Sequence, residues 1–299
     1  MKRKMILGSD FWTDCDDAVA MRLIARAHLK GEIDLLGICL NACMQDSLVA
    51  CDVFLASNGI APPIALDRKA TGMARHTFQD KLAARKSARF SSNEEAEDPI
   101  RFYRRLLAFA DTKVEILEIG FMQVLADLLD SAPDDLSPLD GMTLVHEKVS
   151  HLWIMGGRWD VPIGKEHNFN NNPRTRRGAA ILCDRWPGEI TFLGFEVGAS
   201  VLSGGELSEG DLLHDVLLWH GSGAGRSSWD PMLVLLALVG DHQAAGYSTV
   251  RGRAKVDPET GDNSFLESEN GPHVYVVKTE DDAFYCDAIN RLIASDAEM

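Results

Sequence analysis

Four aspartates lie within eight residues near the start of the chain: Asp10, Asp14, Asp16 and Asp17. An apolar run ends at Asp10 and a helical pattern begins near Asp16, which places the carboxylates between a first strand and its helix. At 4 Å and an effective dielectric constant near 20, each pair of like charges repels by roughly 4 kcal/mol. A divalent cation such as calcium would offset this repulsion, because it binds carboxylate oxygens.

Helix capping is the alternative explanation for part of this cluster. Asp14 or Asp16 could cap the helix, and Asp17 would favour its first turn. Capping does not explain Asp10, which closes the strand before the connection. Open α/β sheets bind ligands beyond the carboxyl ends of their strands, so the position of Asp10 favours a metal or catalytic site.

The rest of the chain alternates between strand and helix. Apolar runs typical of strands lie at 33–40, 63–66, 114–119, 152–155 and 189–193. Helical stripes lie at 18–28, 47–57, 100–110, 124–129, 173–183, 207–220, 231–238 and 282–293. This alternation of strands and helices predicts an α/β fold with an open, mostly parallel, Rossmann-like sheet and helices on both faces. Alternation over 246–256 and 274–277 predicts a small antiparallel C-terminal extension.

Length and composition limit the classes of protein. The 299 residues show no internal repeat or linker, which predicts a single domain over 1–299. A net charge of −15 argues against nucleic acid and anionic membranes as partners. No apolar stretch is long enough to span a membrane, and no secretory pattern precedes Asp10, so we expect a cytoplasmic protein. The six scattered cysteines form no CxxC pair, which indicates reduced thiols rather than a zinc site.

Three more polar segments stand at predicted element boundaries. Residues 164–173 are rich in Asn, Glu and His, which suits hydrogen bonds to sugar hydroxyls, although turns and an N-cap at Asn172 explain them equally well. Asp230 precedes Pro231 at a helix entrance, as an N-cap does. The turn at 120–123 could direct its carbonyls to the edge that holds Asp10. The polar stretch 67–97 is typical of a long surface excursion that contains some helix. This excursion could act as a lid, or it could be disordered.

In this order, the motifs resemble those of the inosine-uridine-preferring nucleoside hydrolase family. Ser9 to Ala20 resembles a longer version of the family's aspartate-rich turn. Ile119 to Ala126 resembles its Gly-Pro-Leu-Thr-Asn turn, and Ile154 to Gly157 matches its Met-Gly-Gly strand end. Glu166-His167-Asn168 with Asn172-Pro173 resembles its sugar-binding loop, and Trp229-Asp230-Pro231 resembles its His-Asp-Pro.

The resemblance implies hydrolysis of the N-glycosidic bond of a ribonucleoside with one bound Ca2+. Asp10, Asp17 and Asp230 would ligate the ion by side chain, and Gln123 by its main-chain carbonyl. Asp10 would also deprotonate the attacking water. The substrate-binding residues would be Asp16 on the ribose 2′-hydroxyl and Glu166, Asn168, Asn172 and Trp12 on the rest of the nucleoside. The partner implied is a small-molecule nucleoside, and the assembly implied is a homo-oligomer.

Several positions depart from the family pattern. Gly8 stands where the common turn has its first aspartate, which removes a supporting carboxylate. Gln123 replaces a threonine and Asn172 an aspartate. Trp229 replaces the histidine credited in some members with protonating the leaving base. Tryptophan is not an acid, but it can stack on a base, so Trp229 is predicted to take part in catalysis by stacking.

Two other classes of function remain open from the sequence. A catalytically silent sugar- or nucleoside-binding protein could keep the same fold, and the missing histidine favours this alternative. An aspartate-nucleophile phosphatase also begins with carboxylates after its first strand. That class needs Asp-x-Asp, whereas Trp12 stands two residues after Asp10.

Overall fold

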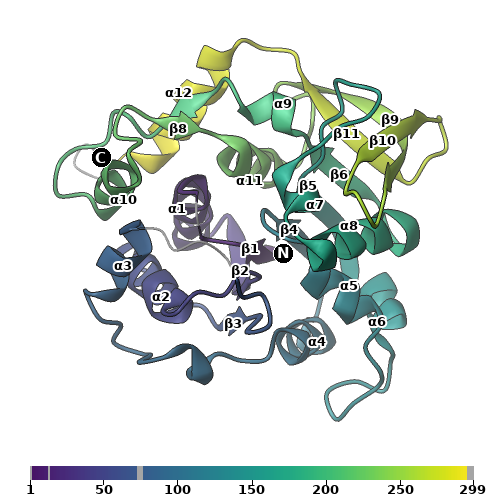
Figure 1. The fold of residues 1–299 in the computed structure, drawn as a ribbon, viewed down its shortest axis with the longest axis horizontal. Coiled ribbons are helices and arrows are strands. Elements are labelled where there is room, and N and C mark those ends of the chain that lie inside the picture. Colours follow the sequence, from purple (N-terminus) through teal and green to yellow (C-terminus); the bar gives the residue numbers. More distant parts are fainter. Residues whose placement is uncertain (1, 13, 73–76, 295–299) are drawn as a thin grey trace.

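The computed structural model describes residues 2–12, 14–72 and 77–294, and nine of its strands form one sheet (Figure 1). In sheet order these strands are β10 (Asn263–Glu267), β9 (Tyr247–Val256), β11 (His273–Lys278), β6 (Ile190–Leu193), β5 (Val149–Met155), β4 (Val114–Glu118), β1 (Arg3–Ser9), β2 (Ile33–Leu40) and β3 (Ile64–Leu66). Neighbours from β11 to β3 are all parallel, and β9 runs antiparallel to β10 and β11. The predicted fold class, including the antiparallel C-terminal extension, is confirmed.

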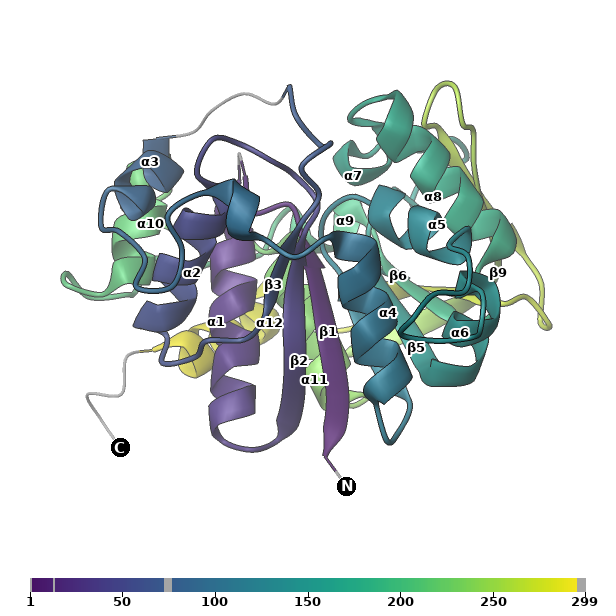
Figure 2. The ribbon, with the colours of Figure 1, turned by 90° about the horizontal axis from the view of Figure 1, so that it is seen from below.

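Helices cover both faces of the sheet because its central strands are apolar on both sides. In β1, Met5 and Leu7 pack into one core and Ile6 into the other. The first core is covered by α1 (Asp16–Leu29), α2 (Ser47–Ser57), α3 (Thr77–Ala83), α10 (Leu212–His220), α11 (Trp229–Val239) and α12 (Asp282–Ile293). The second is covered by α4 (Pro99–Phe109), α5 (Gln123–Leu129), α6 (Gly141–Lys148) and α8 (Pro173–Arg185), and Figure 2 shows α1 and α4 on opposite sides of β1.

Short elements complete the edge where the parallel strands end. They are α7 (His167–Asn170), α9 (Phe195–Gly198), the 3-10 turn η1 (Asn93–Glu95) and the two-stranded pair β7 (Leu202–Ser203) and β8 (Arg226–Ser227). None of the described helices has the length and apolar character needed to cross a bilayer.

The excursion at 67–97 holds α3 and η1 and is anchored at several points in its described part. Phe78 and Leu82 are fully buried against the core, and Arg89 forms an ion pair with the buried Asp52 of α2. The predicted surface excursion therefore carries ordered helix over its described part, which argues against the disordered alternative there. Residues 73–76 lie outside the described residues, and a lid role stays a prediction.

Candidate active site

Three aspartates from two helix starts meet beyond the carboxyl end of β1. Asp16 and Asp17 open α1, and Asp230 is the second residue of α11, which packs directly against α1. Carboxylate oxygens of these three buried residues lie within 4.8 Å of one another. Hydrogen bonds fix them: Asp230 donates its N–H to Asp16 Oδ2 (3.2 Å), and Asp17 Oδ1 accepts from the Ser9 hydroxyl (2.5 Å).

Capping does not account for these carboxylates. The residue before α1 is Cys15 and the residue before α11 is Ser228, and neither helix has a side-chain cap. The prediction that Asp230 is an N-cap is therefore wrong, because α11 begins two residues earlier, at Trp229, and Asp230 lies in its first turn and lines the pocket. These acids stay buried together without the hydrogen bonds that a capping role would give them.

Burial and mutual repulsion raise the pKa of each acid at this point. Burial is the larger cause, followed by Asp16 for both Asp10 and Asp230, by Asp14 for Asp16, and by Asp10 for Asp17. In the absence of metal, these carboxyl groups therefore stay protonated at pH values well above those at which an ordinary aspartate ionises. A buried set of oxygen donors with excess negative charge fits a hard divalent cation, because the cation supplies the missing positive charge.

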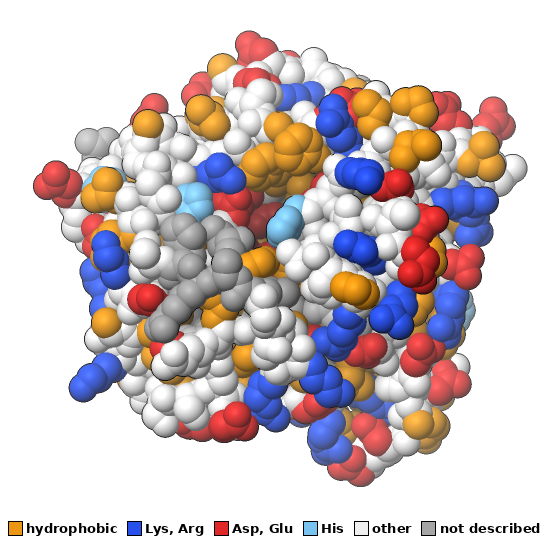
Figure 3. Space-filling view, in the orientation of Figure 1, with side chains coloured by type: hydrophobic (Ala, Val, Ile, Leu, Met, Phe, Trp, Pro, Cys, Tyr) orange, Lys and Arg blue, Asp and Glu red, His pale blue; other side chains and the backbone are white. Residues whose placement is uncertain are grey.

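The acids form one end of a pocket of about 250 Å³. Figure 3 shows acidic side chains inside a hollow on this face of the molecule, with a hydrophobic patch beside them. The pocket is lined by Asp10, Asp14, Asp16, Asp17, Ile119, Met155, Glu166, His167, Asn168, Phe195, Arg226, Trp229 and Asp230. Seven of the ten site residues predicted from the sequence are among them: Asp10, Asp16, Asp17, Glu166, Asn168, Trp229 and Asp230. The other three, Trp12, Gln123 and Asn172, do not line the pocket.

Glu166 and Asn168 belong to the turn that follows β5 and enters α7. Glu166 caps α7, accepting N–H bonds from Asn168 (2.8 Å) and Phe169 (3.2 Å) and one from Gly157 (3.0 Å). Burial raises the pKa of Glu166 to about 7. Asn168 donates its side-chain N–H to the carbonyl of Met155 (3.1 Å). Both polar side chains are therefore held rigidly at the pocket wall.

Aromatic side chains form the other end of the pocket. Trp229 stacks on Phe195, with ring centroids 5.4 Å apart and planes inclined by 25°, and its indole N–H donates to the Phe195 carbonyl (2.8 Å). The guanidinium carbon of Arg226 lies 5.2 Å from the Trp229 ring centroid. A planar group bound in this pocket would meet an aromatic wall on this side.

The three predicted residues outside the pocket have structural partners. Trp12 is buried in a small apolar cluster with Ala42 and Phe121. Asn172 caps α8 by accepting N–H bonds from the next turn, so the alternative explanation of this asparagine is the one supported. Gln123 is the first residue of α5, and its side chain donates to the Asn41 carbonyl (2.7 Å). Ligation of calcium by the Gln123 carbonyl stays a prediction; Ile119 is the residue of this turn that lines the pocket.

Sequence reasoning missed Phe195, Arg226 and His167 as pocket residues. Phe195 follows β6 by two residues, so the rule that ligands bind beyond strand carboxyl ends would have found it. Arg226 gave no such signal, because its ion-pair partner Asp14 lies 212 residues away in the sequence. Its guanidinium forms a bidentate ion pair with Asp14, and this pair holds the pKa of Asp14 below its usual value.

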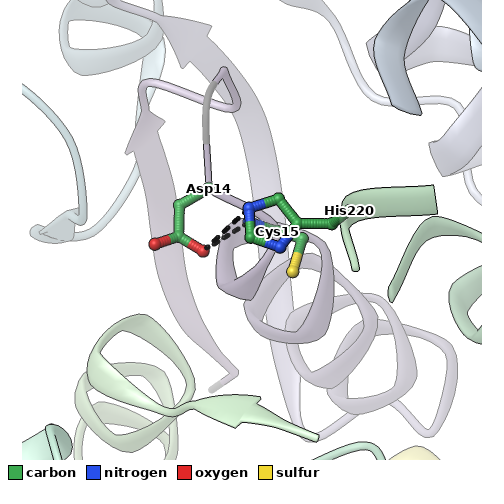
Figure 4. A group of neighbouring side chains, drawn as sticks. All are labelled: Asp14, Cys15 and His220. Atoms are coloured by element: carbon green, nitrogen blue, oxygen red, sulfur yellow. Dashed lines mark hydrogen bonds and ion pairs between the residues drawn. The ribbon is translucent and has the colours of Figure 1, made fainter. Parts of the chain in front are cut away.

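A second group of possible metal donors lies beside the first and consists of Asp14, Cys15 and His220. Their donor atoms lie within 4.8 Å of one another, and Figure 4 shows the Asp14 carboxylate facing the His220 ring. Arg226 already neutralises Asp14, and burial raises the pKa of the Cys15 thiol. Calcium also prefers oxygen ligands to a thiol. The group of Asp16, Asp17 and Asp230 is therefore the better fit for a hard divalent cation.

Solved structures with the same architecture are nucleoside hydrolases and related effector proteins. An inosine-uridine-preferring nucleoside hydrolase from Bacillus anthracis is 16% identical, with a TM-score of 0.67 over 97% of this chain and 99% of that chain. A plant nucleoside hydrolase is 14% identical, with a TM-score of 0.70 over 99% of this chain and 100% of that chain. These matches concern the α/β fold. The chain has the nucleoside hydrolase fold.

The same fold also occurs in an effector protein. The type III effector protein XopQ, in a complex with adenosine diphosphate ribose, is 16% identical, with a TM-score of 0.68 over 98% of this chain and 94% of that chain. No protein-family model and no curated protein sequence matches this chain. At these identities the likeness concerns the fold, and one fold can host several functions.

Proposed function

We propose that this protein hydrolyses the N-glycosidic bond of a ribonucleoside to free base and ribose, with calcium as its metal. The observation that carries this proposal is the meeting of Asp16, Asp17 and Asp230, buried and within 4.8 Å, at the base of a pocket with an aromatic wall. The acids suit a cation and sugar hydroxyls, and the aromatic wall suits a planar base. The nucleoside hydrolase fold supports the same reaction.

Asp10, Asp17 and Asp230 are the proposed side-chain ligands of the ion. When bound, calcium would polarise a water molecule and hold the ribose diol. Asp10 is partly buried at the pocket, where its carboxylate can accept a proton from water held beside the ion. Asp10 therefore takes the proton of the attacking water, while Asp16 accepts a hydrogen bond from the ribose 2′-hydroxyl.

Glu166 and Asn168 are proposed to hold the remaining sugar hydroxyls. Their backbone and side-chain bonds to the ends of β4 and β5 keep them in place before substrate binds. As the C1′–N bond breaks, its electron pair leaves with the base and positive charge develops on the sugar. The nearby carboxylates stabilise that charge, and the base takes a proton from solvent.

Trp229 is proposed to act on the leaving base by stacking. Its ring cannot donate a proton as an acid, but it lies at the pocket wall against Phe195. Stacking holds the base plane so that its ring nitrogens remain open to water. This arrangement favours purines, whose larger ring system gains more from stacking than a pyrimidine does.

Release of reducing sugar from a panel of purine and pyrimidine nucleosides tests the proposal. The expected result is turnover with added calcium and loss of turnover with a chelator. Sugar release that a chelator leaves unchanged would contradict the requirement for a metal ion. No sugar release from any nucleoside would contradict the proposed hydrolysis. Phosphate release from phosphate esters would instead indicate the phosphatase.

Binding of a ribosyl compound without hydrolysis is a second candidate function. It is favoured by Trp229 in place of an acid and by the effector structure that contains adenosine diphosphate ribose. Calorimetry with nucleosides and with adenosine diphosphate ribose distinguishes the two. Saturable binding of either ligand, with no sugar released over hours in calcium, would favour this alternative.

A further inference from the structure

Glu118, the last residue of β4, is a buried carboxyl that the proposed reaction does not use. It pairs with Gly8 of β1 in the parallel register, and its side chain has no exposed surface. A Cβ atom added to Gly8 would lie 2.2 Å from Glu118 Oε2 and 2.6 Å from its Cδ. The Glu118 carboxyl therefore fills the space that a side chain at position 8 would occupy.

The same carboxyl joins the ends of three neighbouring strands. Its Oε1 accepts hydrogen bonds from the Asn41 side chain (2.7 Å), just after β2, and from the Gly120 N–H (3.0 Å), just after β4. Asn41 in turn accepts the N–H of Phe121 (2.9 Å) through its Oδ1. Oε2 has no hydrogen-bond partner among the described residues. One carboxyl oxygen thus organises the turn at 119–121.

This turn packs against the backbone of Asp10. A Cβ atom added to Gly120 would lie only 2.4 Å from the Asp10 amide nitrogen, so the two backbones touch. Ile119 also donates its N–H to the Gly8 carbonyl (2.9 Å), two residues before Asp10. The hydrogen bond from the Gly120 N–H to Glu118 therefore fixes the turn that contacts the Asp10 backbone.

We propose that Glu118 is a positioning residue for the carboxylate site: it holds the Gly120 turn that places Asp10, and it requires glycine at position 8. In this chain a carboxyl from β4 occupies the point at which β1 carries no side chain. The inference rests on the proposed calcium site, and its test reads calcium binding and stability as well as sugar release.

Calorimetric calcium titration of variants is the first measurement. Glu118→Ala is expected to weaken calcium binding roughly 10-fold, because it leaves the buried Asn41 and Gly120 donors unsatisfied. Glu118→Gln keeps an acceptor oxygen at the same place and is expected to stay within about threefold of the natural protein. Glu115→Ala is the matched control, since it removes a carboxyl from the far end of β4 and should leave calcium affinity unchanged.

The second measurement is the thermal stability of a double-variant cycle. Gly8→Asp alone should destabilise the fold, because its side chain meets Glu118, whereas Gly8→Asp combined with Glu118→Ala should be more stable than Gly8→Asp alone. Calcium affinity unchanged in Glu118→Ala, or weakened in Glu118→Gln as far as in Glu118→Ala, would overturn the proposal. The proposal would also be overturned if Gly8→Asp lowered the melting temperature by the same amount with and without Glu118.

The two proposals fail in different ways. If the natural protein binds calcium but hydrolyses no nucleoside, the proposed reaction is wrong, and the calcium affinities of the Glu118 variants still decide the role of this residue. If sugar release occurs and the Glu118 variants bind calcium as the natural protein does, only the positioning role is wrong.

Discussion

The two ends of the pocket are built differently. At the acidic end, Asp16, Asp17 and Asp230 are buried, the Asp16 carboxylate accepts the Asp230 N–H, and the Asp17 carboxylate accepts the Ser9 hydroxyl. At the aromatic end, Trp229 is half-buried and Phe195 has 38% of its surface exposed. Burying like charges costs far more than leaving an aromatic ring half in water. The acidic end is therefore specialised for one ion and a sugar, while the aromatic end tolerates variation in the base.

Replacing the proposed base at the acidic end should have the largest effect. Asp10→Asn removes the carboxylate that accepts the water proton, so kcat is expected to fall roughly 1000-fold, within the range for general-base catalysis. Steady-state sugar release with saturating calcium measures it. Asp135→Asn, at an exposed surface ion pair, is the control and should keep the natural kcat. A kcat within a few-fold of the natural value for Asp10→Asn would remove this residue from the reaction.

A change at the aromatic end should have a smaller and base-dependent effect. Trp229→Ala is expected to lower kcat/KM for purine nucleosides by roughly 10-fold or more, because stacking on an aromatic side chain contributes about 1–3 kcal/mol per base. Trp229→Phe keeps a stacking ring and should recover most of the loss. An equal loss for purines and pyrimidines, or no loss, would show that this wall does not select the base.

Two buried glutamates near the acidic end, Glu118 and Glu166, should also make stability depend on pH when metal is absent. Burial raises the pKa of Glu118 to about 8 and that of Glu166 to about 7, from an ordinary value of 4.5. The protonated forms of these two carboxyls contribute stability that is fully present below the unfolded-state pKa. This stability is lost as the pH rises through the folded-state pKa values. The melting temperature in chelator should therefore fall between about pH 5 and about pH 8, and calcium should raise it more at the higher pH. A calcium effect independent of pH would contradict this coupling.

The smallest effect is expected outside both ends. Asn172→Ala removes the cap of α8 and should lower the free energy of unfolding by about 1 kcal/mol. Because Asn172 does not line the pocket, kcat/KM should be unchanged. Denaturant unfolding and steady-state kinetics measure the two quantities. A fall in kcat/KM at unchanged stability would place Asn172 back at the substrate.

Elements with clear local signals were predictable from the sequence. The strand at 33–40 and the helices at 47–57 and 282–293 have the bounds of β2, α2 and α12, because apolar periodicity and flanking turn residues mark both ends. The helix α6 was not predicted. Its eight residues run without a turn from Lys148 into β5, so its apolar residues merge with those of the strand.

The acidic end of the site was predictable and the aromatic end only in part. Carboxylates at a strand end are informative by residue type, so Asp10, Asp16 and Asp17 could be identified before their partners were known. Phe195 follows the end of β6 and could have been found by the same rule, whereas Arg226 reaches the pocket through tertiary packing that no local pattern encodes. The contact of the Glu118 carboxyl with Gly8 could not be predicted from a local pattern either, because it depends on the register of two strands whose paired residues are 110 positions apart.

A crystal structure grown with calcium, with the anomalous signal collected, tests the central claim most directly. The account predicts one calcium ion per chain, held by oxygens of Asp10, Asp17 and Asp230 at about 2.3–2.6 Å, with at least one bound water left for a substrate to meet. Ordinary solvent between these three carboxylates at saturating calcium, or carboxylates turned away from one another, would contradict it.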